Sequence, residues 1–296
     1  MKKFTALLLA FILVIGLTAC GSGAGAGNGT GSGDASTGGI SKSSQEFIDA
    51  LNAENAEEKG VCGADLTWYY KDNVLVIKGT GPMNDYDFFR GIEAPWYDKG
   101  LMDKIHWLII EEGVTSIGDS AFEGIRILSK AELPSTIETI GDSAFDGCLD
   151  LSLITIPDSV TTIGSHAFFN CNSLPSITIP SSVTTIDSFV FYGCGALSSI
   201  TIPSNVTEIG DSAFFGCESL SSVTIPSSVA EIGDSAFRYC DSLTSVTFEG
   251  DAPEMVYTDG NGIFDGCELE QLTVTYSGSG FEPLIEAYPE INWVKK

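Results

Sequence analysis

A 23-residue spacing recurs through this 296-residue chain and restricts its possible folds more than any other feature. Prolines return at this step at Pro134, Pro157, Pro180, Pro203 and Pro226. Phenylalanines keep the same step from Phe122 to Phe237, and cysteines keep it from Cys148 to Cys240. One copy is too short to bury enough apolar surface to fold alone. The spacing therefore predicts a solenoid, in which neighbouring coils share one core.

The order of residues within one copy predicts the path of a coil. Ile200 and Ile202 alternate with polar residues, which indicates a short strand with one face turned inward. Pro203 ends this strand because it has no N–H group to donate to a neighbouring strand. Further along, Gly210 is expected to permit a sharp bend, and Asp211 to cap a helical turn that carries the phenylalanine.

The repeated string LxxITIPxSVTxIGDSAFxGC resembles the leucine-rich repeats of treponemal, or BspA-like, bacterial surface proteins over about residues 105–276. CGADLTWYYKDNVLVIKGTGPM, at residues 62–83, is similar to the N-terminal cap of these proteins, and the last 25 residues, LTVTYSGSGFEPLIEAYPEINWVKK, are similar to their C-terminal cap. The resemblance implies leucine-rich repeats at 108–276, a β-rich N-terminal cap at 60–107 and a C-terminal cap at 277–296.

Two segments ahead of the repeats carry weaker patterns. Apolar residues alternate on both sides of Lys71-Asp72-Asn73, which predicts a hairpin that covers the first open edge of the solenoid. Residues 41–59 hold a single weak apolar stripe, formed by Phe47, Ile48 and Leu51. This segment is expected to form a short helix or a mobile stem rather than part of the core.

The N-terminal residues have the pattern of an export signal. Two lysines precede an apolar stretch that is too short to span a bilayer as a helix. The sequence Leu17-Thr18-Ala19-Cys20 resembles the lipobox of bacterial lipoproteins. This implies a signal peptide at residues 1–19 and lipid attachment at Cys20, although an ordinary secretory signal with a chance cysteine is the alternative. Small and polar residues dominate 20–40, which predicts a flexible tether.

The acidic balance of the chain restricts its partners. There are 14 Lys and Arg residues against 40 Asp and Glu residues, giving a formal net charge of −26. Nucleic acid is not an expected partner, because its binding relies on cationic side chains that neutralise phosphates. Electrostatic docking on anionic lipid is disfavoured for the same reason. We expect a monomer whose membrane contact is made only through lipid on Cys20.

The regularly spaced cysteines raise the question of thiol chemistry. Equivalent residues on stacked strands lie about 4.8 Å apart with parallel side chains, whereas a disulfide needs converging Cβ atoms about 3.8 Å apart. Zinc sites use clustered spacing such as C-x₂-C. We therefore expect free, buried cysteines that act as small apolar residues, with redox or metal roles as the alternative. Cys62 lies outside the column, and its partner stays open.

No catalytic, cofactor or metal site is predicted. The chain has two histidines, His106 and His166, and no nucleophile, base and orienting group are evident around either. His166 is expected to point to solvent. Acidic side chains on two successive copies form a candidate calcium site: Glu208, Asp211, Glu231 and Asp234. Local capping explains the aspartates better, because other copies carry the same residue at that position.

Two surfaces are candidate partner sites. Aromatic residues follow the core phenylalanine in three successive copies, with a further tyrosine close by: Phe169, Tyr192, Phe215 and Tyr239. Exposed aromatic rows are typical of partner surfaces, yet the rings can instead stack on one another as a stabilising ladder. The outward strand positions carry small hydroxyl residues: Thr178, Thr201 and Thr224. A flat hydroxyl face suits docking of a macromolecule, although threonine is also a good strand residue in its own right.

These features predict a membrane-anchored lipoprotein on a bacterial cell surface. Its solenoid is expected to bind proteins or other macromolecules on host or bacterial surfaces. The family resemblance implies adhesion and no enzymatic activity. The alternative is a structural or scaffold protein of the cell envelope with no dedicated ligand.

Overall fold

The computed structural model describes residues 42–87, 90–255 and 262–296, which all belong to one compact unit spanning residues 37–296. The expected signal peptide, the tether and Cys20 lie outside the described residues. No helix in the described ranges has both the length and the apolar character needed to cross a bilayer.

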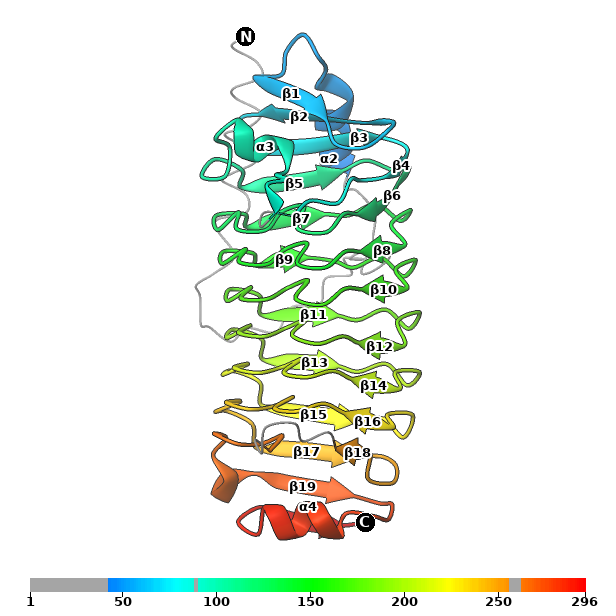
Figure 1. Ribbon diagram of the computed structural model, residues 1–296, viewed down its shortest axis with the longest axis vertical. Coiled ribbons are helices and arrows are strands. Elements are labelled where there is room, and N and C mark those ends of the chain that lie inside the picture. The colour runs from blue at the N-terminus through cyan, green and yellow to red at the C-terminus, as the bar shows by residue number, and fades with distance from the viewer. Residues whose placement is uncertain (1–41, 88–89, 256–261) are drawn as a thin grey trace, which may run out of the picture. The chain divides into compact units, whose positions relative to one another are not determined.

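The repeats form coils stacked along one axis, with two parallel strand ladders (Figure 1). The first ladder runs through β5 (Trp107–Ile110), β7 (Lys130–Glu132), β9 (Leu153–Ile154), β11 (Ser176–Thr178), β13 (Ser199–Thr201), β15 (Ser222–Ile225), β17 (Ser245–Phe248) and β19 (Thr273–Tyr276). The second runs through β4 (Gly81–Pro82), β6 (Val114–Ile117), β8 (Thr139–Ile140), β10 (Thr162–Ile163), β12 (Thr185–Ile186), β14 (Glu208–Ile209), β16 (Glu231–Ile232) and β18 (Glu254–Met255). Register follows the sequence spacing, since Ile177 pairs with Ile200 and Ile186 with Ile209. The predicted repeat solenoid is confirmed.

A column of stacked phenylalanine rings fills the core. Ring centroids lie 5.5 Å apart between Phe145 and Phe168, 5.7 Å between Phe168 and Phe191, 5.5 Å between Phe191 and Phe214, and 5.2 Å between Phe214 and Phe237. These rings are buried and their planes are nearly parallel. The column gives each coil an apolar contact with the coil before it and the coil after it.

The repeated thiols complete hydrogen bonds between coils. Each Sγ donates to the carbonyl of the core phenylalanine in the preceding coil, at 3.1–3.3 Å, from Cys148, Cys171, Cys194, Cys217, Cys240 and Cys267. These thiols are free, and all but the half-buried Cys267 are buried. Burial raises the pKa of Cys194 to about 12, so its thiol stays protonated and can donate. Cys62 is also free and buried, and burial raises its pKa to about 12. The expected structural role of the column is confirmed.

The turn that follows the second ladder differs from the prediction. Asp211 does not cap a helical turn: its carboxylate accepts from the backbone N–H of Asp234, one coil further on, at 2.8 Å. The left-handed backbone falls at Ser212, whose φ is 52°, rather than at Gly210. Gly210 is needed for another reason, since a Cβ there would lie 2.6 Å from the backbone nitrogen of Ser188. The glycine permits close approach of two coils.

An antiparallel hairpin begins the N-terminal cap, as predicted. The cap strands are β1 (Glu58–Val61), β2 (Leu66–Lys71) and β3 (Val74–Gly79). β2 and β3 pair antiparallel, and β3 then pairs parallel with β5 of the first ladder. Asp72 and Asn73 form the turn with positive φ values of 51° and 68°. The hairpin therefore covers the edge that the first coil would otherwise leave open.

A tryptophan extends the phenylalanine column into this cap. Trp96 lies in α3 (Pro95–Asp98), and its ring stacks on Phe122 at 5.2 Å with planes 10° apart. Its Nε1 donates to the carbonyl of Ala121 at 3.0 Å. The tryptophan thus closes the core at the N-terminal end.

The segment expected as a short helix or mobile stem is a packed helix, α2 (Lys42–Ala50). Ile48 is fully buried, and Leu51 packs with it against a cluster that includes Ile109 of β5. Lys78 donates from Nζ to the carbonyl of Leu51 at 2.7 Å, which satisfies a group at the end of the helix. The expected short helix is therefore present, and it is packed rather than mobile, because α2 covers the outer side of the first strands in a cluster separate from the main core.

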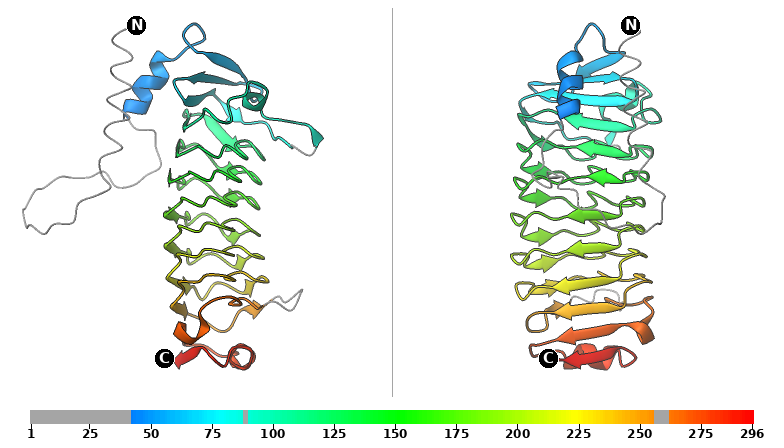
Figure 2. Two further views of the ribbon diagram at one scale, coloured as in Figure 1. Left: turned by 90° about the vertical axis from the view of Figure 1, so that its left-hand side faces the viewer. Right: turned by 180° about the vertical axis from the view of Figure 1, so that it is seen from behind.

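The C-terminal cap continues the first ladder and closes the core. After the short helices η2 (Leu269–Gln271) and α4 (Glu282–Ala287), β20 (Asn292–Lys295) pairs parallel with β19 (Figure 2). The Tyr288 ring meets the last core phenylalanine, Phe264, edge-on at 5.7 Å. Its hydroxyl accepts from the backbone N–H of Phe264 at 3.2 Å. This contact satisfies an amide that would otherwise face the end of the stack.

Candidate functional site

The candidate aromatic residues form one continuous row on the turns that follow the second ladder. Phe169 and Tyr192 stack at 4.6 Å with planes 10° apart, and Tyr192 and Phe215 at 4.4 Å with planes 5° apart. Tyr239 meets Phe215 edge-on at 5.1 Å. The sequence spacing therefore brings all four predicted residues together.

A second, shorter column widens this row into a patch. Phe189 and His166 occupy equivalent positions in neighbouring coils, and their rings stack at 4.6 Å. The Phe189 ring lies 6.1 Å from that of Tyr192, and the His166 ring 5.4 Å from that of Phe169. Sequence reasoning missed Phe189, although the 23-residue step from His166 leads directly to it. We call these six residues the aromatic patch: Phe169, Tyr192, Phe215, Tyr239, Phe189 and His166.

His166 is half-buried in the patch rather than pointing freely to solvent. Its Nδ1 lies 2.8 Å from the hydroxyl of Ser165. Burial lowers the pKa of the imidazole, while the carboxylates of Asp142 and Asp187 act in the opposite direction. Neutral imidazole suits its stacked position against Phe189.

The rings of the patch are both packed and accessible. Five of the six are half-buried, and Tyr239 is 43% exposed. Because neighbouring rings cover one another's faces, mainly their edges remain at the surface. Packing and partner binding, which the sequence left as alternatives, are compatible in this geometry. The stacking also holds the rings rigidly, so their side chains would lose little conformational entropy when a partner binds.

The row of aromatic rings ends in charged residues on both sides. The guanidinium of Arg238 lies 4.8 Å from the Tyr239 ring centroid, within cation–π distance. In the two coils before Phe169, the equivalent position is acidic: Glu123 and Asp146. Burial, followed by repulsion from Glu123, raises the pKa of Asp146 to about 6. The patch is therefore bordered by carboxylates at one end and by a cation at the other.

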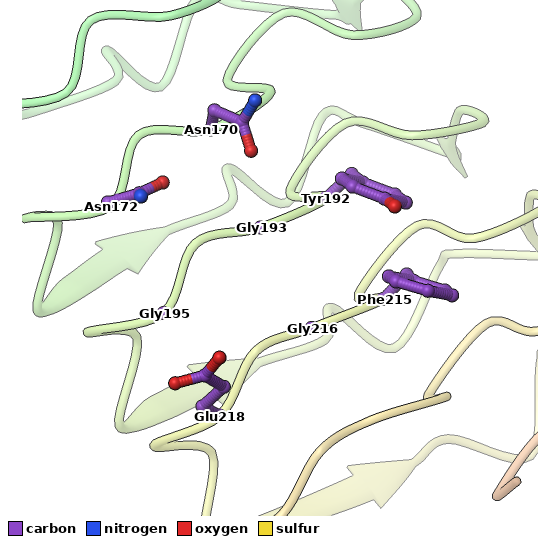
Figure 3. A pocket seen from close by; sticks show the side chains of 8 residues that line it. All are labelled: Asn170, Asn172, Tyr192, Gly193, Gly195, Phe215, Gly216 and Glu218. Atoms are coloured by element: carbon purple, nitrogen blue, oxygen red, sulfur yellow. The ribbon is translucent and has the colours of Figure 1, made fainter. Parts of the chain in front are cut away.

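A shallow groove of about 480 Å³ lies beside two rings of the patch (Figure 3). It is lined by Asn170, Asn172, Tyr192, Gly193, Gly195, Phe215, Gly216 and Glu218. Its floor is a glycine backbone, and a Cβ placed on Gly195 would have no neighbour within 4 Å. Sequence reasoning did not find this groove, because missing side chains create it.

The predicted hydroxyl face is present on the other ladder. Thr178, Thr201 and Thr224 are exposed on β11, β13 and β15, and Thr178 pairs in register with Thr201. These residues lie on the first ladder, whereas the aromatic patch follows the second. The structure thus offers two separate candidate surfaces.

The considered calcium site is not assembled. Asp211 bonds the amide of Asp234, which leaves its role structural. Across the described ranges, no group of three or more His, Cys, Asp or Glu side chains is arranged to hold a metal ion. The four acids therefore offer no metal centre in this part of the chain.

The fold defines a leucine-rich repeat solenoid, and comparison with known families specifies it further. The family described as the BspA type leucine rich repeat region matches residues 101–220 and 161–282, with six copies. The chain belongs to this family. A search of curated proteins finds no match.

Several solved structures are similar to this chain. A leucine-rich repeat protein of T. pallidum is 24% identical, with 83% of this chain and 97% of that chain covered and a TM-score of 0.49. A leucine-rich repeat protein of Bacteroides ovatus is 21% identical, with coverages of 79% and 78% and a TM-score of 0.47. A leucine rich cell surface protein of Faecalibacterium prausnitzii is 20% identical, with coverages of 82% and 96% and a TM-score of 0.44.

Proposed function

We propose that this protein is a non-enzymatic, lipid-anchored bacterial surface protein that binds protein partners, and that the aromatic patch is its contact surface. The observation that carries this proposal is the contact among six accessible rings on one edge of a rigid solenoid. Tyrosine and other aromatic residues supply a large share of binding energy in protein interfaces. Leucine-rich repeat membership supports protein–protein interaction, and adhesion to host matrix or to other cells is the biological role that we propose for it.

The patch is tested by retention of partners on the immobilised full-length protein. Extracellular-matrix proteins and extracts of bacterial surface proteins are passed over the wild type and over the triple variant Phe169→Ser, Tyr192→Ser, Phe215→Ser. We expect the triple variant to bind a retained partner at least about tenfold more weakly, because interface hot spots exceed this effect. Circular dichroism checks that the variant remains folded.

A matched triple variant on the hydroxyl face separates the two candidate surfaces. Thr178→Ala, Thr201→Ala and Thr224→Ala should leave retention unchanged. Loss confined to this second variant would place binding on the first ladder and overturn the assignment of the patch. If no partner from either source is retained by the wild type, a scaffold role in the envelope replaces adhesion.

The membrane anchor is proposed from the lipobox-like sequence Leu17-Thr18-Ala19-Cys20. Cells that express the protein should incorporate labelled palmitate into it, and Cys20→Ala should abolish the incorporation. Labelling that persists in this variant would contradict lipid attachment at Cys20.

A further inference from the structure

The groove lies where one coil lacks the side chain that the other coils carry after the column cysteine. Successive coils carry, at the position after the column cysteine, Arg126, Leu149, Asn172, Gly195, Glu218, Asp241 and Glu268. Gly195 interrupts this row, and Gly193 supplies the adjoining part of the floor. Asn172 borders the gap from the preceding coil, and Glu218 borders it from the following coil (Figure 3).

The groove offers hydrogen-bond acceptors. In the amide orientation that satisfies its neighbours, the Asn172 nitrogen donates to the carbonyls of Asn170, at 3.0 Å, and Gly193, at 2.7 Å. Both hydrogens of this amide are therefore used, while its oxygen can accept. The exposed carboxylate of Glu218 adds a charged acceptor. A ligand that suits this lining is one rich in N–H donors.

The carboxylates beside the groove favour a cation, although the guanidinium of Arg238 lies 5.9 Å from the ring centroid of Phe215. Beyond Glu218, the next two coils present the exposed carboxylates of Asp241 and Glu268. Within the described ranges, none of these three acids forms an ion pair. The whole chain carries a formal charge of −26, so its field attracts basic partners and repels acidic ones.

The two aromatic rings that line the groove suit the apolar part of such a ligand. Tyr192 and Phe215 belong to the aromatic patch and also line the groove. Lys and Arg side chains pack their apolar stems on apolar surface and keep the charged group at polar partners. The edge of the patch would contact the stem, while Glu218 and Asn172 receive the charged end.

We propose that the groove binds a lysine or arginine side chain from a basic segment of a protein partner. The proposal rests on the proposed function, because it places the groove at the border of the aromatic patch. It adds the chemistry of the partner: a donor-rich, positively charged segment lying beside Glu218.

The test measures binding of a fluorescent decalysine peptide to the full-length protein by anisotropy. We expect Glu218→Gln to weaken binding about threefold, as for loss of an exposed ion pair. Gly195→Arg should weaken it about tenfold or more, since it fills the groove with a cation of its own. Glu208→Gln is the matched control, because it removes another exposed carboxylate, which lies on the second ladder, and this variant should bind like the wild type.

Three other results would overturn the proposal, and each would point to a different explanation. Equal weakening by Glu218→Gln and Glu208→Gln would mean that only the overall charge attracts the peptide. A neutral oligosaccharide that binds the wild type, is lost in Gly195→Arg and is unaffected by Glu218→Gln would assign the groove to a glycan. If protein partners depend on the patch but decalysine does not bind, this inference fails while the proposed function stands.

Discussion

Replacing Phe214 by alanine is expected to lower the free energy of unfolding by about 3–5 kcal/mol, which is typical for loss of a buried aromatic ring. Its ring is fully buried and stacks on Phe191 at 5.5 Å and on Phe237 at 5.2 Å. The truncation opens a cavity that neither neighbour can fill without breaking its own stacking. Urea unfolding of the full-length protein, followed by circular dichroism, measures the loss.

The adjacent residue provides the control for this prediction. Phe215 follows Phe214 in the chain and also stacks on a ring of the neighbouring coil, but it is half-buried at the surface. Phe215→Ala should therefore cost clearly less than Phe214→Ala. Because each coil contacts mainly its neighbours, Phe214→Ala should also broaden the transition as the two halves of the solenoid uncouple. Equal losses in the two variants would contradict the assignment of the inner ring as the core contact.

The architecture could be predicted because one spacing governs every coil. A 23-residue step assigns the same environment to each phenylalanine and each cysteine, and geometry then excludes disulfides between neighbouring rungs. The same reasoning did not identify the acceptor for each thiol. The bond from Cys217 to the carbonyl of Phe191 joins two coils, and a single copy shows only its own residues.

Contacts between coils also explain the errors in the predicted turn. Asp211 and Gly210 look like a cap and a bend when one copy is read alone. In the stack, the carboxylate bonds an amide one coil further on, and the glycine makes room for the coil before it. Both roles depend on the distance between coils, which the sequence pattern does not contain.

The sequence contains an indication that a segment such as α2 covers the cap, which the repeat spacing alone does not reveal. Val74-Leu75-Val76-Ile77 is an unbroken apolar run in β3, and all four residues are buried. Such a run indicates a strand covered on both faces, so the outer face of the cap needed a cover. The groove beside the patch left a weaker signal, since a half-buried glycine such as Gly195 is also common in ordinary turns.

Replacing Gly233 by alanine is expected to cost about 1–3 kcal/mol, although it adds only one methyl group. A Cβ at this position would lie 2.4 Å from the backbone nitrogen of Asp211 and 2.5 Å from its carboxylate oxygen Oδ1. The coils must separate to admit it, which weakens the 2.8 Å bond from the N–H of Asp234 to that carboxylate. Thermal unfolding compared with Gly195→Ala gives the control, because a Cβ on Gly195 meets no atom within 4 Å.

One coil of this chain already carries a side chain at the position equivalent to Gly233. Asp187 occupies the position of Gly233 two coils earlier, and the residue that it faces in the preceding coil is Ser165 rather than an aspartate. The carboxylate of Asp187 instead accepts from the N–H of Ser188, at 2.8 Å. A side chain is therefore tolerated in that coil, whereas at Gly210, which also faces a serine, a Cβ would lie 2.6 Å from the backbone nitrogen of Ser188. Asp211→Ser should therefore recover little of the stability lost in Gly233→Ala, because the backbone nitrogen 2.4 Å from the added Cβ remains in place, whereas a large recovery would show that the carboxylate is what excludes the methyl group.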